Sequence, residues 1–348
     1  SNQSTFSNSG TANIANNLTL QNSDLTNSGT LNAANLSASD ADLSNSGTAT
    51  IANDVTLQGS DLTNSGTFNA TDLSTSNADL TNSGTMELNT LDGVNATIEN
   101  TGTIQNLNTA TLNSSTMDNR GGTLNFNGGS SFSLVSSLLQ DNGNTITGLA
   151  TLNIDSDSTV THETDVATDT SLADDIINRG TLNVTSPNGA FTGDNITSSG
   201  SFDFSGPLLK LADTFESSGI WSVSNGTGAV TVEADRIDLG SSTQVRTPLV
   251  KDAVKFDVQN DVPLAGDLFI DEGGTITGAN ETEVVVFEAL NGNSFNGNFD
   301  AVNWDLDAVD NPIFSFTLLP SNLSNKMAVR MERDFLNKVL RPVLNENQ

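Results

Sequence analysis

The residues of this chain that could carry out chemistry are mainly carboxylates. The sequence has 348 residues, with 42 Asp and Glu, 12 Lys and Arg, one His and no Cys or Tyr. Glycoside hydrolysis requires two carboxyl groups about 5–9.5 Å apart. Close pairs in the sequence include Asp40/Asp42, Asp155/Asp157 and Asp174/Asp175. So many acids produce such pairs by chance, and none lies beside clustered Lys, Arg and aromatic residues that could hold an acidic sugar. We therefore predict that the chain is not an enzyme, with a polysaccharide-degrading enzyme as the less favoured alternative.

Other residue types that could take part in catalysis or binding do not form a recognisable set. His162 is the single His, so no Ser-His-Asp set can be assembled, and we expect an exposed polar side chain there. Trp221 and Trp304 have apolar neighbours and are expected in a core rather than on a sugar-stacking platform. Oxygen ligands for Ca²⁺ are plentiful, but there is no EF-hand spacing. We expect no cofactor, with Ca²⁺ as the alternative.

The charge and hydropathy of the chain exclude two further classes. The formal net charge is −30 at pH 7, whereas nucleic-acid binding needs clustered Lys and Arg to meet phosphates. No apolar run approaches the roughly 18 residues that a membrane-spanning helix requires. We therefore expect neither a nucleic-acid partner nor a membrane-spanning segment.

An internal repeat dominates the first third of the sequence. The phrase Asn-Ser-Gly-Thr begins at Asn8 and returns every 18 or 19 residues, followed by Asn-Thr-Gly-Thr from Asn100 and a degenerate copy at Arg120-Gly121-Gly122-Thr123. A fixed period of this length indicates one small unit stacked many times, because a single unit cannot bury its own apolar face.

The composition of the repeat favours strands over helices. Asn, Ser, Thr and Gly disfavour helix interiors. Short apolar–polar alternations such as Leu18-Thr19-Leu20 and Val55-Thr56-Leu57 are typical of strands, and the polar phrase supplies the turns between them. Each unit of 18–19 residues is therefore predicted to form one coil of an all-β, parallel β-solenoid.

The first Asn of the repeated phrase occupies an equivalent position in every coil. Equivalent residues of adjacent coils lie about 4.8 Å apart, a spacing at which Asn side chains hydrogen-bond in ladders. The alternative is that these residues only occupy turns. The predicted ladder residues are Asn8, Asn27, Asn45, Asn64, Asn82 and Asn100.

The character of the sequence changes along the chain. Residues 1–125 form the regular repeat, and residues 126–283 read as an irregular continuation of the solenoid. Residues 284–331 contain longer apolar strands that could close its open end, and residues 332–348 read as a helical tail. The expected architecture is thus a solenoid with a short strand and helix cap.

The C-terminal tail differs in charge from the rest of the chain. Residues 326–348 carry five basic and three acidic side chains, whereas no Lys or Arg precedes Arg120. Such a segment can fold back on its own last coils or dock on another copy, where opposite charge favours the encounter. The residues predicted for such a contact are Arg330, Arg333, Phe335, Leu336, Lys338, Leu340 and Arg341.

The phrase Asn-Ser-Gly-Thr-Leu-Asn at residues 27–32 and its period resemble the passenger domains of autotransporters. They equally resemble filamentous-haemagglutinin-like proteins of the two-partner secretion type. The stretch from Val284 to Arg333 is similar to the way many such passengers end. This resemblance implies a right-handed parallel β-helix at the surface of a Gram-negative bacterium, acting in adhesion or biofilm formation.

These observations favour a structural role outside the cell. The predicted function is a self-assembling fibre or matrix subunit, or an adhesin-like rod, built by head-to-tail contacts between copies. A monomeric adhesin that binds a surface glycan is the alternative.

Overall fold

The computed structural model describes residues 4–143, 145–165, 167–225, 229–248, 254–271, 282–291, 293–297, 299–305, 314–320 and 326–333. The chain divides into two compact units. One comprises Ser1–Thr164 with Ser171–Asn183, and the other comprises Asp165–Thr170 with Val184–Gln348. All the regular elements of the described residues are strands. The predicted all-β solenoid is confirmed.

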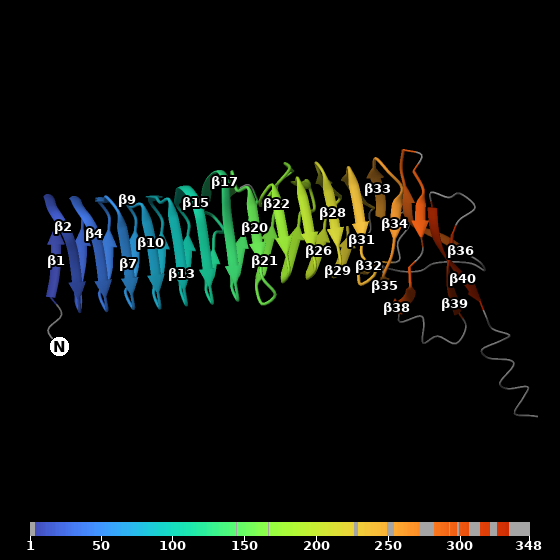
Figure 1. The fold of residues 1–348 in the computed structure, drawn as a ribbon, viewed down its shortest axis with the longest axis horizontal. Helices are drawn as coiled ribbons and strands as arrows, with labels where there is room; N and C mark the ends of the chain where they lie inside the picture. Colours follow the sequence, from blue (N-terminus) through green and yellow to red (C-terminus); the bar gives the residue numbers. More distant parts are fainter. Residues whose placement is uncertain are drawn as a thin grey trace, which may run out of the picture. The chain divides into compact units, whose positions relative to one another are not determined.

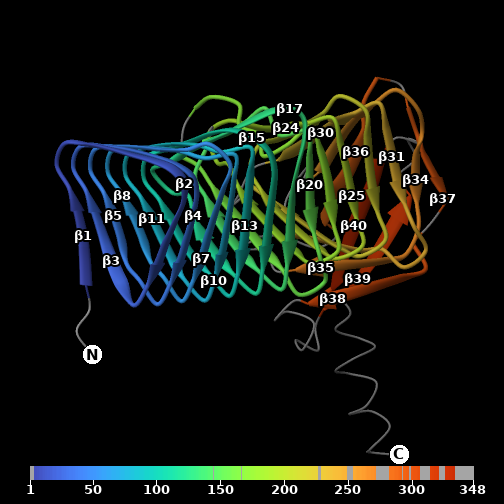
Figure 2. The same cartoon turned by 60° about the vertical axis from the view of Figure 1, so that its left-hand side comes forward.

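The first unit is built from parallel coils of two or three strands each, and Figure 1 shows these coils side by side. One coil consists of β8 (Leu62–Asn64), β9 (Thr67–Asn69) and β10 (Asp72–Ser76), and the next repeats the pattern 18 residues later with β11, β12 and β13. Equivalent strands pair in parallel without register slip, so Leu62 lies beside Leu80 and Asn64 beside Asn82. Figure 2 shows the coils of this unit stacked one behind another.

One strand of each coil belongs to a first sheet. Its members in this unit are β1 (Ser4–Asn8), β3 (Ser23–Asn27), β5 (Leu43–Asn45), β8, β11 (Asp79–Asn82), β14 (Thr97–Asn100), β16 (Thr116–Asp118), β18 (Leu138–Asp141), β21 (Thr159–Glu163) and β23 (Thr181–Thr185).

The remaining strands of each coil form a second, branched sheet. Its members are β2 (Thr11–Gln21), β4 (Thr30–Ser39), β6 (Thr48–Ile51), β7 (Asp54–Gln58), β9, β10, β12 (Thr85–Glu87), β13 (Thr90–Val94), β15 (Thr103–Asn113), β17 (Thr123–Val135), β19 (Ile146–Thr147), β20 (Thr151–Ile154) and β22 (Asp175–Asn178).

The interior of the coils is a set of apolar stripes. Side chains alternate across each strand, so the apolar residue of one coil meets its counterpart in the next. Leu43, Leu62 and Leu80 form part of one such stripe and are at most 3% exposed. Because a slip of one residue would turn a whole stripe outward, the stripes hold the coils in register.

The glycine of the repeated phrase is required by a close approach between coils. A Cβ at Gly66 would lie 2.1 Å from the carbonyl oxygen of Gly47, and the same contact recurs at the other interior copies. Thr67 N donates to that carbonyl oxygen at 2.9 Å. Any side chain at Gly66 would therefore push apart the two coils that this hydrogen bond joins.

A second corner of each coil requires a left-handed residue. The φ angles of the residues there are close to +50°, a region that Gly, Asn and Asp tolerate best. The residues are Asn22, Asp40, Gly59, Asn77, Asn95, Ser114 and Ser136. The polar composition of the repeat thus reflects backbone geometry as well as exposure to water.

The second unit is also built from coils, but more residues separate its paired strands in the sequence and its core side chains are larger. Phe202, Phe215, Trp221, Phe256 and Phe287 are buried and form a chain of ring contacts 4.7–6.2 Å apart between centroids. The expectation that Trp221 belongs to a core is confirmed. The side chain of Trp304 lies outside the described residues.

Four sets of strands make up this unit. The first set is β26 (Ser201–Ser205), β29 (Ile220–Ser224), β32 (Gln244–Pro248), β35 (Asp267–Asp271) and β38 (Ala301–Asp305). The second is β25 (Asn195–Ser198), β28 (Thr214–Ser217) and β31 (Arg236–Leu239). The third is β24 (Ala190–Gly193), β27 (Leu208–Leu211), β30 (Val230–Ala234), β33 (Val254–Val258), β36 (Thr282–Ala289), β40 (Lys326–Arg333) and β39 (Phe314–Pro320), and the last is β34 (Val262–Leu264) with β37 (Phe295–Gly297).

The end of the third set departs from the parallel pattern and corrects one prediction. β40 pairs antiparallel with both β36 and β39. Residues 332 and 333, predicted to begin a helix, belong to β40 instead, because they pair with Ser315 and Phe314 of β39 and extend the strand that contains Met327 to Met331. Residues 334–348 of the predicted tail lie outside the described residues.

The glycine contact leads to a first prediction. Gly66→Ala should lower the free energy of unfolding by about 3 kcal/mol, the upper end of ordinary overpacking, because the new methyl group meets backbone rather than a movable side chain. Gly10→Ala is the matched control, since a Cβ there meets nothing within 4 Å. Urea denaturation followed by circular dichroism measures both. Equal midpoints for the two variants would contradict the close-approach explanation.

Candidate functional site

The most specific polar structure in the first unit is a row of buried asparagines. All six predicted ladder residues lie in this row. The Nδ2 of Asn8, and then of each asparagine in turn, donates to the Oδ1 of the next at 2.7–2.8 Å, as far as Asn100. The four interior members between them are at most 4% exposed. The row is therefore a continuous chain of amide hydrogen bonds within the solenoid.

The local strand geometry explains why these side chains point inward. Asn64 lies two residues after Leu62 in β8, and residues two apart share one face of a strand. Its amide donates to Asn82 Oδ1 at 2.8 Å and to the carbonyl oxygen of Thr85 at 3.2 Å. Both acceptors belong to the following coil. Each member of the row donates in the same way to an asparagine and to a Thr carbonyl oxygen, so every amide donates toward the following coil.

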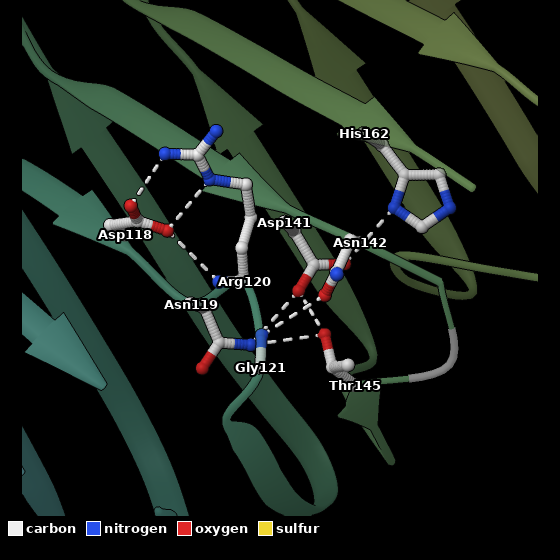
Figure 3. Close-up of polar contacts among 8 residues, drawn as sticks. All are labelled: Asp118, Asn119, Arg120, Gly121, Asp141, Asn142, Thr145 and His162. Atoms are coloured by element: carbon white, nitrogen blue, oxygen red, sulfur yellow. Dashed lines mark hydrogen bonds and ion pairs between the residues drawn. The ribbon is translucent and has the colours of Figure 1, made fainter. Parts of the chain in front are cut away.

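Three residues that the sequence prediction missed extend this row. Asn100 donates to Asn119 Oδ1 at 2.7 Å, and Asn119 Nδ2 donates to Asp141 Oδ1 at 2.9 Å. Asp141 Oδ2 lies 3.0 Å from His162 Nδ1 (Figure 3). Asp141 and His162 are neighbours in the register of β18 and β21. Asp141 follows Asn119 by 22 residues and His162 follows Asp141 by 21, so both continue the spacing of the row. The Gly-Thr pair that follows the earlier members is absent after these two residues.

The expectation that His162 is exposed is wrong. Its side chain and that of Asp141 have no exposed surface. In β21 the inward positions are Val160 and His162, which share one face, so His162 follows the alternation of the strand. The Asp141 carboxylate also accepts the hydroxyl of Thr145. Carboxylate oxygens accept hydrogen bonds, so we assign the Nδ1–H tautomer of His162 as the donor to Asp141.

The pair at Asp118 and Arg120 lies near this buried cluster but is exposed (Figure 3). The Arg120 guanidinium donates to both carboxylate oxygens of Asp118, at 3.0 and 2.7 Å. This hydrogen bonding lowers the pKa of Asp118 from its usual value. Exposed pairs of this kind contribute little stability, so Asp118 serves below as a control for Asp141.

The first described coil pairs with the next in the same way as the later coils. β1 pairs with β3 and β2 pairs with β4, both in parallel. Phe6, Ile14 and Leu18 of this coil are partly buried, whereas Leu25 of the next coil is 4% exposed. Asn8 Oδ1 accepts the backbone N–H of Gly10 at 3.3 Å.

The predicted C-terminal contact residues are only partly placed. Arg330 and Arg333 belong to β40, where Arg330 lies opposite Glu283 of β36 and Thr317 of β39 in the strand register. Their side chains lie outside the described residues, as do Phe335, Leu336, Lys338, Leu340 and Arg341. Lys326, at the start of β40, forms an ion pair with Glu288 at 2.9 Å.

Described residues of each unit line a cavity. In the second unit a cavity of about 650 Å³ is lined by carboxylates and amides, among them Glu233, Asp257 and Asn291. Asn291 Nδ2 donates to Asp257, and Lys210 forms an ion pair with Glu233 at 3.0 Å. In the first unit a cavity of about 440 Å³ crosses five coils and is lined mainly by uncharged residues.

No group of three or more His, Asp or Glu side chains among the described residues could hold a metal ion. The described residues also include no helix that could span a lipid bilayer.

Comparisons with protein-family models, with curated proteins and with solved structures give no significant match to this chain.

The ladder leads to a second prediction. Asn64→Asp keeps the shape of the side chain but replaces its two donors with an ionised, acceptor-only group facing Asn82 Oδ1 and Thr85 O. We expect a loss of about 3 kcal/mol in the free energy of unfolding at pH 7, from buried unsatisfied groups and a buried charge. Urea denaturation measures this loss.

The pH dependence and a control variant sharpen this test. Burial raises the folded-state pKa of the new carboxyl, so the folded chain binds more protons and the loss shrinks as the pH falls through that raised value. Asn35→Asp is the matched control, because Asn35 donates to Asn17 Oδ1 at 2.7 Å on the exposed surface. A loss for Asn64→Asp that is as small as that of Asn35→Asp would contradict a stabilising ladder.

A third prediction concerns the buried carboxylate. Asp141→Ala should lower the free energy of unfolding by about 3 kcal/mol, because it removes the acceptor of both Asn119 and His162, and a buried donor left unsatisfied costs about 1–3 kcal/mol. Asp118→Ala removes the carboxylate of an exposed ion pair and should change the free energy of unfolding by less than about 1 kcal/mol. Thermal and urea denaturation of the two variants measure the difference, and equal losses would refute the role given to Asp141.

Proposed function

We propose that this chain is a structural subunit of an extracellular fibre or matrix, whose β-solenoids stack head to tail. The observation that carries the proposal is the self-complementary stacking of near-identical coils. β8 pairs with β11 in parallel, so that Leu62 lies beside Leu80 and Asn64 beside Asn82. A coil of one copy therefore presents the groups that a coil of another copy needs in order to pair with it.

A second copy of the chain is the partner that we propose. A contact between two different surfaces of the same molecule propagates into a fibre when rotation does not close it. Charge supports the pairing, because no Lys or Arg precedes Arg120 whereas Lys326, Arg330 and Arg333 lie in the C-terminal strand β40. Opposite charges would speed the encounter and orient it.

The proposed location is the exterior or surface of a Gram-negative cell. This part of the proposal rests on the repeat phrase, which resembles those of autotransporter passengers and filamentous-haemagglutinin-like proteins, and on the solenoid fold. A strongly acidic surface keeps a secreted chain soluble until it meets its partner. A structural role rather than an enzymatic one is proposed because the buried His162 is engaged with Asp141 and no solvent reaches either side chain.

A fourth prediction tests the assembly. Negative-stain electron microscopy of the purified chain over a range of concentrations should show fibres. The double variant Phe6→Lys/Ile14→Lys should abolish them, because it places charge on the partly buried apolar side chains of the first described coil. Val94→Lys is the matched control, since it changes an apolar side chain that is 41% exposed on an inner coil. Isolated particles at all concentrations of the unmodified chain would overturn the proposal.

The opposite end is tested by a deletion. Removal of residues 334–348 leaves β40 intact and eliminates the predicted contact residues of the tail. We expect fibres to be lost while the β-sheet circular-dichroism spectrum is retained. Fibres formed by the truncated chain would show that the tail is not the C-terminal contact. The lysine variants test the contact at the first described coil separately.

A further inference from the structure

One outer side of the coils in the first unit presents two regular rows of side chains. This side is formed by β6, β9 and β12 and by the leading residues of β2, β4, β15 and β17, and we call it the Thr face. Its first row is threonine in all seven coils, from Thr11 through Thr67 to Thr123, with each residue paired in register to the next. These threonines are exposed or half-exposed. The second row lies two residues further along each strand and includes Asn13, Asn32, Thr50, Asn69, Glu87 and Gln105.

The Thr face carries less charge than the other two outer sides of the same coils. The one charged residue in its two rows is Glu87, whose carboxylate accepts a hydrogen bond from Gln105 Nε2 at 2.7 Å. No Lys or Arg precedes Arg120 in the sequence, so no basic side chain offsets the acids of the coils before it. On the other two sides carboxylates occupy adjacent coils, Asp61 before β8 with Asp79 of β11, and Asp54 of β7 with Asp72 of β10.

This distribution of charge determines through which side a second copy of the chain can approach. The chain has a net charge of −30, so two copies repel one another in general. Like charges that lie opposite one another in an interface disfavour the contact strongly. Two copies that met through the sides of Asp61 or Asp54 would place carboxylates against carboxylates, whereas two Thr faces would place hydroxyls and amides together.

The Thr face is also complementary to itself. Its threonines recur at the strand separation of about 4.8 Å, and a second copy carries the same row with the same interval. A Thr hydroxyl both donates and accepts hydrogen bonds, so it can pair with another Thr hydroxyl. Because β-branched side chains have few rotamers, ordering them in a contact costs little conformational entropy. Facing sheets with identical rows of side chains pack closely for these reasons.

The size of the Thr face limits the strength of such a contact. Seven coils extend for about 30 Å and two rows for about 10 Å, so each copy would contribute roughly 300 Å². Stable protein interfaces bury about 1,000 Å² or more in total. Two single chains would therefore pair weakly, whereas fibres that repeat the face would pair through many copies at once.

We propose that the Thr face is a lateral interface between two copies of this chain, related by a two-fold axis, and that it joins neighbouring fibres side by side. The same surface of each copy takes part, as in other two-fold interfaces. The joining of fibres rests on the proposed head-to-tail assembly, but the pairing of two Thr faces does not. Lateral pairing would convert single fibres into the bundles of a matrix.

Crosslinking of single cysteines tests the pairing whether or not fibres form. The chain has no Cys, so each variant carries one thiol. Thr67 is the middle member of its row, so a two-fold related copy places its own Thr67 opposite it whichever way the two chains run. With a short bis-maleimide at high protein concentration, Thr67→Cys should give crosslinked dimers.

Thr63→Cys is the matched control for this measurement. Thr63 lies in the same coil, exposed on the outer side of β8. It should give only the dimers that random collisions produce, once the yields are corrected for the reactivity of each thiol towards a mono-maleimide. Equal corrected yields from the two variants would overturn the proposal.

Electron microscopy tests the joining of fibres. The unmodified chain should form bundles, and Thr67→Asp/Thr85→Asp should form only single fibres, because the new carboxylates of facing copies repel one another. Thr63→Asp/Thr81→Asp adds the same charges to the same two coils on the side of the first sheet and should keep the bundles, with a melting temperature equal to that of the other double variant.

The outcomes separate this inference from the head-to-tail assembly. Bundles formed by Thr67→Asp/Thr85→Asp, or bundles lost equally in both double variants, would overturn the lateral role of the Thr face. Crosslinking of Thr67→Cys in a chain that forms no fibres would contradict the head-to-tail assembly and support the pairing of Thr faces.

Discussion

The asparagine ladder is the interaction on which the order of the first unit depends. Each amide donates forward twice, to the next asparagine and to a backbone carbonyl of the next coil, as Asn45 does to Asn64 and Thr67. Each such bond contributes only about 0.5–1.5 kcal/mol, but a buried donor without its acceptor costs about 1–3 kcal/mol. Misalignment of one coil would leave groups unpaired on both sides. The ladder therefore acts mainly by penalising every register other than the native one.

Backbone sterics impose the same register from outside the core. Gly66 can only lie where Gly47 leaves room, and the left-handed corner recurs at Asn77 and Asn95 with equal φ angles within a few degrees. The repeated phrase thus satisfies three separate constraints, which are an amide for the ladder, a glycine for close approach and a Thr N–H that donates to the glycine carbonyl oxygen of the preceding coil. This agreement between local and long-range demands is what allows short strands to stack over many coils.

The repeat made the solenoid and the six ladder positions predictable, because period and residue type pointed to the same geometry. Asp141 and His162 were not predictable in this way. The coils that carry them are longer, and no Gly-Thr pair follows either residue, so nothing in the sequence marks them as members of the row. His is intermediate in its tendency to be buried, and only the pairing of β18 with β21 places His162 against a carboxylate. The strand at residues 332 and 333 was missed because the sequence pattern was read as changing to a helix at Glu332, whereas Glu332 and Arg333 pair with Ser315 and Phe314 of β39.

The direction of the ladder explains why an aspartate occurs where it does. Asp in an interior position would set its lone pairs against the Oδ1 of the following asparagine, so an acceptor-only group fits only where donors arrive from both sides. Asp141 is such a position, because Asn119 donates to it from one coil and His162 from the other. The direction of donation reverses there, and the amide series ends. At the other end of the described series, Asn8 Oδ1 accepts the backbone N–H of Gly10. Because every amide donates toward the following coil, a coil stacked on β1 would extend the series only by bringing a donor to this oxygen.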